Sequence, residues 1–236
     1  MKELRAFVDA DSICYSAGYC EHDAEMRMAV DMYVRRIAEA TGAQRLFFIV
    51  ENPFEKRNYR NDVAVTKPYK GNRRDKTKPP FVKDAKLYMR QRYGAIFVDD
   101  QESEDLMTIM AQEWGLEWSV KCCIDKDCLQ HPGTYYDYRT QKLFEIDEEY
   151  ARFALWRQIL TGDSVDNIPG LKGIGPKKAE ALLTEGPTYL KAVVRAYKAH
   201  GHPYKYMLEQ SRLIYIRKER GEMFTPCSKY EYEEWK

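Results

Sequence analysis

Short runs of consecutive apolar residues alternate with longer helical segments along the first 150 residues. The apolar runs are rich in Val, Ile and Phe, which is typical of buried strands, and they lie at 4–8, 45–50, 95–98 and 118–124. The segments between them predict helices over about 23–41, 82–93 and 103–115. Strands that alternate with helices predict an α/β fold whose mostly parallel sheet carries helices on both faces.

The pattern changes near residue 148. Just before this point, 134–146 alternates like a β-hairpin. After it no convincing strand follows, and the pattern predicts four successive helices, at about 148–161, 175–185, 187–199 and 203–219. We therefore expect an α/β domain over 1–148 and a helical region over 149–236.

Composition places the chain among globular proteins. Its 236 residues are 44% hydrophobic and 32% charged, which suits one large domain or a domain with a smaller appendage. No apolar run approaches the roughly 18 residues that span a membrane, and the N-terminal MKELRAFVDAD lacks the apolar core of a signal peptide. We expect a cytoplasmic protein without a membrane partner, whose six cysteines are reduced thiols.

The distribution of charge is more informative than its total. The net charge is +1, from 38 bases and 37 acids, yet 67–78 holds six bases and one acid. Such a run is often only a solvated loop. The acids gather in DADS, DDQESED, DKD and GDSVD. Basic and acidic patches in one chain together indicate a metal site that handles phosphate.

The acidic clusters are placed to converge. Asp9 ends the first predicted strand, the DKD motif ends the fourth, and Glu102 and Asp105 share a face of the helix after the third. Asp163 and Asp166 share a face if TGDSVD forms a helical turn. Carboxyl ends of parallel strands meet at one sheet edge, so we expect one acidic site there.

Acids at helix starts also serve as caps, which is the alternative for any single cluster. Some eight carboxylates crowded together would raise each other's pKa unless cations neutralised them. Oxygen ligands without His or Cys suit Mg²⁺, for which Mn²⁺ can substitute.

Five motifs occur in an order that resembles the 5′→3′ exonuclease and flap endonuclease family, which includes the 5′-nuclease domain of bacterial DNA polymerase I and stand-alone phage exonucleases. They are FVDADS, YKGNR (69–73), ESEDLMTIMA (102–111), DKD (125–127) and LTGDSVDNIPGLKGIGPKKAEALL (160–183). The last is the most specific. The resemblance covers most of 4–185 and implies a PIN-like flap-nuclease fold, and the chain is similar to a compact phage version that would act in the host cytoplasm.

The resemblance implies a role for each matching position. It places metal-binding acids at Asp9, Glu102, Glu104, Asp105, Asp125, Asp127, Asp163 and Asp166. The first four are expected mainly at one Mg²⁺ and the last four at a second. Catalytic roles on the phosphate are implied for Lys70 and Arg73, with Tyr69 beside them. Two departures affect the metal geometry: Glu104 replaces an aspartate and Ile124 replaces a glycine, while Glu51 stands where the family has an aspartate.

Two further segments are expected to contact DNA. In this family the region matching 67–90 forms an arch over the active site, and the basic residues here are Lys67, Lys70, Arg73, Arg74, Lys76, Lys78, Lys83 and Lys86. The second segment, GLKGIGPKK, matches a helix-three-turn-helix element, often with a K⁺ ion, that grips duplex DNA. Its expected DNA-binding residues are Gly170, Lys172, Gly173, Gly175, Lys177 and Lys178.

The expected function is a structure-selective 5′ nuclease that cleaves DNA by a two-metal mechanism, in phage or bacterial replication and primer removal. Two Mg²⁺ ions about 4 Å apart would activate a water and stabilise the leaving oxygen. The expected partner is duplex DNA with a single-stranded 5′ end or an RNA primer, and the protein is expected to be a monomer. Two alternatives remain open, a PIN-like ribonuclease and a non-catalytic DNA-binding protein.

Overall fold

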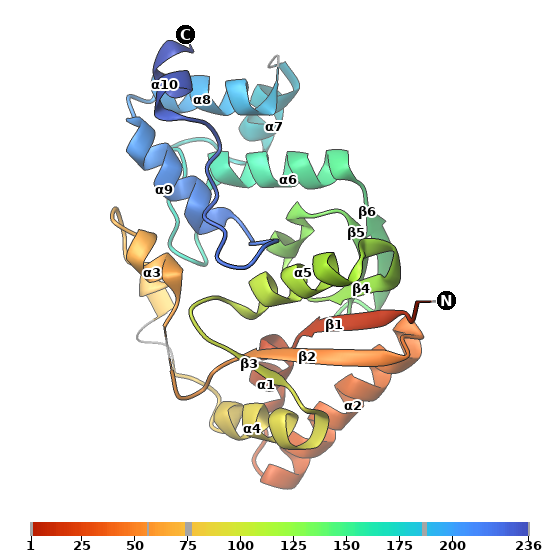
Figure 1. The fold of residues 1–236 in the computed structure, drawn as a ribbon. Coiled ribbons are helices and arrows are strands. Elements are labelled where there is room, and N and C mark those ends of the chain that lie inside the picture. The colour runs from red at the N-terminus through yellow and green to blue at the C-terminus, as the bar shows by residue number, and fades with distance from the viewer. Residues whose placement is uncertain (1, 56, 74–76, 186–187, 236) are drawn as a thin grey trace.

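The computed structural model describes residues 2–55, 57–73, 77–185 and 188–235. A six-stranded sheet lies at the centre of its α/β part, in the order β3-β2-β1-β4-β5-β6 (Figure 1). The strands are β1 (Arg5–Asp9), β2 (Arg45–Glu51), β3 (Ile96–Val98), β4 (Ser119–Cys122), β5 (Gly133–Asp137) and β6 (Lys142–Ile146). Neighbouring strands from β3 to β5 pair in parallel, and β6 pairs antiparallel with β5. The mostly parallel sheet and the terminal hairpin are confirmed.

Helices cover both faces of this sheet. Successive side chains of a strand point to opposite faces, so Ala6 and Val8 of β1 enter one core while Phe7 enters another. The first core lies under α1 (Asp11–Ala17), α2 (Asp23–Thr41) and α4 (Val82–Tyr93), and the second under α5 (Ser103–Trp114). β1 and β4 are buried over almost their whole length and β2 over its second half, which explains the apolar runs in the sequence.

The helical region packs around a core of its own. It consists of α6 (Glu148–Thr161), α7 (Pro176–Glu185), α8 (Tyr189–Ala199), α9 (Tyr204–Ile214) and α10 (Lys229–Glu234), above the sheet in Figure 1. Asp147 fixes the start of α6, because its side chain accepts the Tyr150 N–H at 2.7 Å. Tyr69, which belongs to the α/β part, is buried in the core of the helical region. Side-chain packing therefore crosses the predicted boundary at 148.

Two expectations about local structure are corrected. The helix predicted over 203–219 ends at Ile214, where Tyr215 turns to an extended conformation. The short helices α1, α3 (Tyr59–Val63) and α10 were not predicted. Single turns of 3₁₀ helix also occur at Gly71–Arg73, Leu116–Trp118 and Lys126–Gln130.

The structure also bears on cysteine chemistry and membrane contact. All six cysteines are free thiols, as expected. Within the described ranges, none of the helices combines the length and the apolar character that crossing a bilayer requires.

Candidate active site

Asp9 stands at the carboxyl edge of the sheet as the last residue of β1, and only 2% of it is exposed. Ser103 donates its hydroxyl to Asp9 Oδ1 at 2.6 Å, and the Asp11 N–H donates to the same oxygen at 3.1 Å. Burial and the nearby charge of Asp11 raise the pKa of Asp9 to about 7. The edge of the sheet thus holds a fixed carboxyl, and none of the ion pairs among the described residues involves it.

Glu102, just before α5, is contacted by three polar side chains. It forms an ion pair with Lys70, and it accepts hydrogen bonds from the Tyr69 hydroxyl at 3.0 Å and from Asn58 Nδ2 at 3.2 Å. Burial alone would raise its pKa, but Lys70 and Arg60 lower the pKa of Glu102 to about 2. Glu102 is therefore ionised at every physiological pH.

Glu104 joins Asp9 and Glu102 in one negative cluster. Burial, then the charges of Asp9 and Glu102, raise the pKa of Glu104 well above its usual value, and Asp125 adds to this effect. The acids of β1, of the α5 start and of the segment after β4 therefore lie within electrostatic reach of one another. This is the convergence predicted from the carboxyl ends of parallel strands.

A second acidic group forms around the turn after β4. Burial and the charge of Asp125 raise the pKa of Asp127 to about 7, and an interaction with Asp163 adds to this effect. Lys126 Nζ lies 2.9 Å from Asp127 Oδ1 and 3.7 Å from Asp163 Oδ2. The carboxylates of Asp127 and Asp163 thus lie beside one lysine, whose positive charge a divalent cation can replace.

Asp166 connects the helical region to the base of the expected arch. It accepts a hydrogen bond from the Tyr69 hydroxyl at 2.8 Å, pairs with Arg73, and lies 3.8 Å from Lys70 Nζ. The backbone N–H of Lys70 also donates to the Asp166 carbonyl at 2.9 Å. The three residues expected to act on the phosphate are therefore gathered around Glu102 and Asp166.

The segment 162–170 is a closed loop, which corrects the expected helical turn. Asp163 and Ile168 exchange two backbone hydrogen bonds, at 2.8 and 2.7 Å, and the Asp163 carboxylate accepts the Val165 N–H at 2.6 Å. The neck closes because Gly162 and Gly170 touch: a Cβ on Gly162 would lie 2.5 Å from the Gly170 nitrogen. The Asp163 side chain, which accepts a backbone N–H, and two glycines at positive φ stabilise this loop in place of helical hydrogen bonds.

The rest of the glycine-rich segment points outward. Nothing lies within 4 Å of a Cβ placed on Gly173 or Gly175, and α7 begins at Pro176 as expected. The lysines expected to contact DNA, Lys172, Lys177 and Lys178, are exposed. Gly170 differs, because it is buried and its backbone is bonded to Gln210 and Tyr206. The backbone of Gly170 therefore makes its close approach to other residues of this chain.

The root of the expected arch is fastened to α9. Glu209 accepts the N–H groups of Val65 and Thr66 at 2.8 and 2.7 Å, and the Thr66 hydroxyl at 2.6 Å. Lys86 does not line an opening: it pairs with Asp11 and donates to the Glu51 carbonyl at 3.1 Å. Arg74 and Lys76, two of the expected DNA-binding residues, lie outside the described residues.

Asp105 is the one predicted acid that the structure directs away from the cluster. It is fully buried and pairs with Arg60, whose Nη1 lies 2.6 Å from Oδ2. Arg60 and Asn58 were missed because an isolated arginine or asparagine carries no sequence signal. Asp11, in contrast, lies in the same FVDADS motif as Asp9, so the strand-end argument could have found it.

The donor set fits a hard divalent cation. No group of three or more His, Cys, Asp or Glu side chains forms a ready ligand set within the part of the chain that the structure describes, and Lys70, Arg73 and Lys126 neutralise the acids instead. Carboxylate oxygens are the ligands that Mg²⁺ and Mn²⁺ prefer. Burial, and then the neighbouring charges of Asp11 and Asp125, raise the pKa values of Asp9 and Asp127, and a bound cation would oppose both effects.

Comparison with known sequences gives short matches. No protein-family profile matches the chain. DNA polymerase I of Rhizobium leguminosarum is 68% identical over 70 residues, which is 26% of this chain. DNA polymerase I of Caldicellulosiruptor bescii is 36% identical over 59 residues, or 22% of this chain. Each match spans 7% of the polymerase, so the chain is similar to a small part of these enzymes.

Comparison with solved structures gives matches over nearly the whole fold. A bacteriophage T5 flap endonuclease in complex with DNA and metal ions has a TM-score of 0.70 at 14% identity, covering 89% of this chain and 88% of that one. The T5 5′-exonuclease with bound zinc gives 0.69 at 15% identity, with the same coverage. The catalytic core of Rad2 with a DNA substrate gives 0.52 at 16% identity, covering 84% and 62%. The predicted fold class and the resemblance to flap nucleases are confirmed.

Proposed function

We propose that this chain is a metal-dependent 5′ nuclease that hydrolyses DNA phosphodiester bonds as a 5′→3′ exonuclease, a flap endonuclease or both. The observation that carries this proposal is the meeting of acids from β1, α5, the turn after β4 and the 162–168 loop beside Lys70 and Arg73, on a flap-nuclease fold. The substrate is duplex DNA with a single-stranded 5′ end or an RNA primer, in replication and primer removal, and the protein acts as a monomer.

The proposed chemistry divides the acids between two cation sites. Asp9, Glu102 and Glu104 would hold one ion, and Asp125, Asp127, Asp163 and Asp166 the other. Two Mg²⁺ ions, when bound, would supply an activated water and a clamp for the leaving oxygen. A K⁺ ion at the 170–175 turn would join that turn to a phosphate of the duplex.

Lys70 acts as a fixed positive charge. Burial alone would lower its pKa, but Glu102 and Asp166 raise the pKa of Lys70 above its usual value. It therefore cannot serve as a general base. Lys70 and Arg73 are preorganised cations, and they can exchange their carboxylate partners for the oxygens of a scissile phosphate.

Mapping products from 5′-labelled flap, nicked, blunt and single-stranded DNA, with Mg²⁺ and with chelator, tests the proposal. We expect short 5′ products from flaps or ends in Mg²⁺ and none with chelator. The same structures made of RNA test the alternative of a PIN-like ribonuclease, which would cleave RNA in preference to DNA. Binding without cleavage of any form would favour the non-catalytic alternative.

Metal affinity should fall as the pH drops below 7. Asp9 and Asp127 have pKa values of about 7 without metal, so below this pH an incoming cation must displace a proton. The apparent affinity should then fall about tenfold per pH unit for each displaced proton and level off above pH 8. Calorimetric titration with Mn²⁺ between pH 5.5 and 8.5, in two buffers of different ionisation enthalpy, counts these protons. An affinity independent of pH across this range would contradict the assignment.

Removing Lys177 and Lys178 should weaken duplex binding and make it less sensitive to salt. Both side chains are exposed at the start of α7, where a phosphate can also meet the free N–H groups of the helix. Each lost phosphate contact should lower the slope of log affinity against log salt by about 0.9. The matched control is Arg35→Ala with Arg45→Ala, two exposed cations at the opposite edge of the sheet, which should leave the slope unchanged. Equal slopes for the two double variants would exclude the hairpin as the duplex contact.

A further inference from the structure

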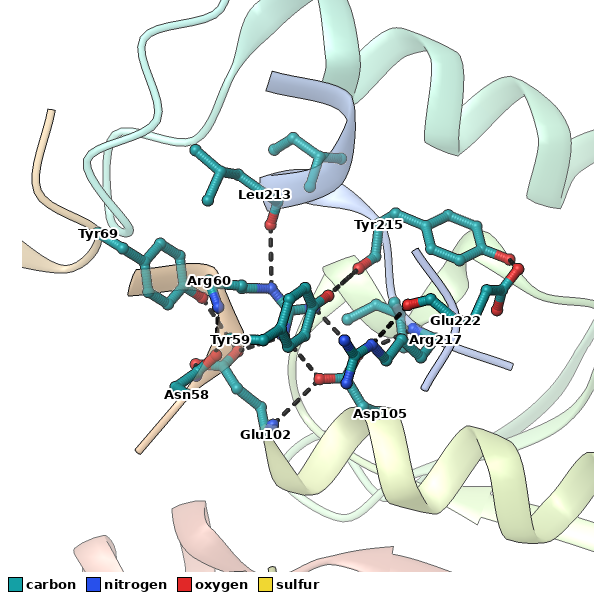
Figure 2. Close-up of polar contacts among 12 residues, drawn as sticks. Asn58, Tyr59, Arg60, Tyr69, Glu102, Asp105, Leu213, Tyr215, Arg217 and Glu222 are labelled. Carbon is teal, nitrogen blue, oxygen red and sulfur yellow. Dashed lines mark hydrogen bonds and ion pairs between the residues drawn. The ribbon is translucent and has the colours of Figure 1, made fainter. Parts of the chain in front are cut away.

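Arg60 lies at the centre of a polar network that joins three distant segments (Figure 2). It belongs to the short helix α3 and is 1% exposed. Its guanidinium forks onto Asp105, with Nη1 2.6 Å from Oδ2 and Nη2 3.0 Å from Oδ1. A buried bidentate pair of this kind fixes both partners in direction as well as in distance.

Asp105 has no oxygen left for a cation. Besides the two bonds from Arg60, Oδ2 accepts the backbone N–H of Glu102 at 3.0 Å and Oδ1 accepts the backbone N–H of Arg217 at 2.8 Å. These four hydrogen bonds occupy both lone pairs of both oxygens. The carboxylate therefore ties α3, the start of α5 and the chain after α9 to one point.

Arg60 also explains why α9 stops at Ile214. Its Nε donates to the Leu213 carbonyl at 3.1 Å and its Nη2 to the Tyr215 carbonyl at 2.7 Å. Arg217 then stacks over the Tyr59 ring at 3.4 Å, beside Arg60. Groups from the α/β part of the chain therefore hold the segment 213–217 beside the active site.

The network reaches Glu102 by two routes. The backbone of Glu102 is fixed by its bond to Asp105, in a reciprocal cap at the start of α5. The side chain of Glu102 is held by Asn58, which also caps α3 by accepting the Arg60 N–H at 2.9 Å. Arg60 Nη1 itself lies 4.0 Å from Glu102 Oε2. The Asn58 cap and Arg60 of α3 therefore act on the carboxylate of Glu102 directly, beside Lys70 and Tyr69, and on its backbone through Asp105.

We propose that Arg60 and Asp105 are positioning residues that hold Glu102 in place for a divalent cation, and that Asp105 is not itself a ligand. This inference rests on the proposed function. It makes residues 213–217 part of the support of the active site, although they lie outside the α/β part. The affinity for the cation would then depend on Arg60, although Arg60 contacts neither the cation nor DNA.

The test measures Mn²⁺ binding without DNA, by electron paramagnetic resonance, and hydrogen exchange of the Glu102 amide in chelator. Asp105→Asn and Arg60→Lys should each weaken Mn²⁺ binding by about 10- to 100-fold, the range for groups that orient ligands. The double variant that combines Asp105→Asn and Arg60→Lys should bind Mn²⁺ no more weakly than the single variant of lower affinity, because both substitutions break the same ion pair. Both single variants should also speed exchange of the Glu102 amide. Arg220→Met, which removes an exposed pair with Glu113, is the control and should match the parent.

A second double variant separates positioning from stability. Arg60→Met with Asp105→Leu removes both charges together, so no buried charge is left unpaired, although the backbone groups of Glu102, Leu213, Tyr215 and Arg217 lose their partners. Its stability should therefore exceed that of either single variant. If the pair only stabilises the fold, thermal stability and Mn²⁺ affinity will recover together, which would overturn the proposal. If the pair positions Glu102, affinity stays low while stability recovers.

The ligand role for Asp105 makes a different prediction. Asp105→Asn would then weaken Mn²⁺ binding, whereas Arg60→Lys would leave it at the parent value, and this result would also overturn the proposal. A parent protein that binds Mn²⁺ but cuts no form of DNA would refute the proposed nuclease function and leave the Mn²⁺ comparison decisive. The two failures are therefore distinguishable.

Discussion

Replacing Asp9 by asparagine should reduce cleavage of a 5′ flap in Mg²⁺ by roughly 10³-fold, the scale of losing one preorganised charge from a closed site. Asparagine keeps the shape of the side chain and can still accept the Ser103 hydroxyl, so the fold should persist. It removes the central negative charge at the end of β1. Single-turnover cleavage of a labelled flap gives the rate.

The same substitution should not destabilise the metal-free protein at pH 8. Burial raises the pKa of Asp9 to about 7, so above this pH its ionised form weakens the folded state, and this cost is lost in the variant. Asp23→Asn, an exposed acid paired with Arg27 at 2.8 Å, is the matched control and should cleave like the parent. An Asp9→Asn protein that cleaves within threefold of the parent would remove Asp9 from the site.

Gly162→Ala should destabilise the folded protein by about 3 kcal/mol, because it combines backbone strain with a close contact. Gly162 has φ of 68°, where a side chain adds strain of about 1–2 kcal/mol, and a Cβ there would also meet the Gly170 backbone. The displaced loop carries Asp163 and Asp166, so cleavage should fall as well. Chemical unfolding measures the first effect and the flap assay the second.

Gly42 provides the control for this prediction. Its φ is 60°, but nothing lies within 4 Å of a Cβ placed there. Gly42→Ala should therefore cost only the strain of the left-handed conformation. The additional cost at Gly162 combines its less favourable backbone conformation, with ψ of −169° against 16° at Gly42, and the closeness of the loop neck. Equal losses of unfolding free energy in Gly42→Ala and Gly162→Ala would show that the loop neck can open without penalty.

Local signals explain why so many elements were predicted. The helices over 23–41 and 82–93 end where Gly42 and Gly94 adopt the left-handed conformation, and α6 begins behind the Asp147 cap. The buried strands are short apolar runs, so their positions follow from composition alone. The placement of Asp9 at the sheet edge then followed from its position at the end of the first predicted strand.

The errors come from contacts that are distant in sequence. The pattern of 203–219 is helical, but Arg60, which is 153 residues from Leu213, captures the carbonyls where the helix would continue. ESED gives no indication that Glu104 faces the acids while Asp105 faces Arg60, because that choice depends on a buried arginine elsewhere. The glycines of 162–170 signalled a turn, but not that two of them would touch each other.

The bond between Glu209 and the segment at Val65 and Thr66 has a consequence for protein engineering. A chimaera joined near residue 148 would combine the sheet of one nuclease with the helices of another, and the sequence pattern makes this junction attractive. Such an exchange would separate Glu209 from the two N–H groups that it holds, and it would also take Tyr69 out of its core. A workable graft has to move 59–69 together with the helices, so the unit of exchange is discontinuous in sequence.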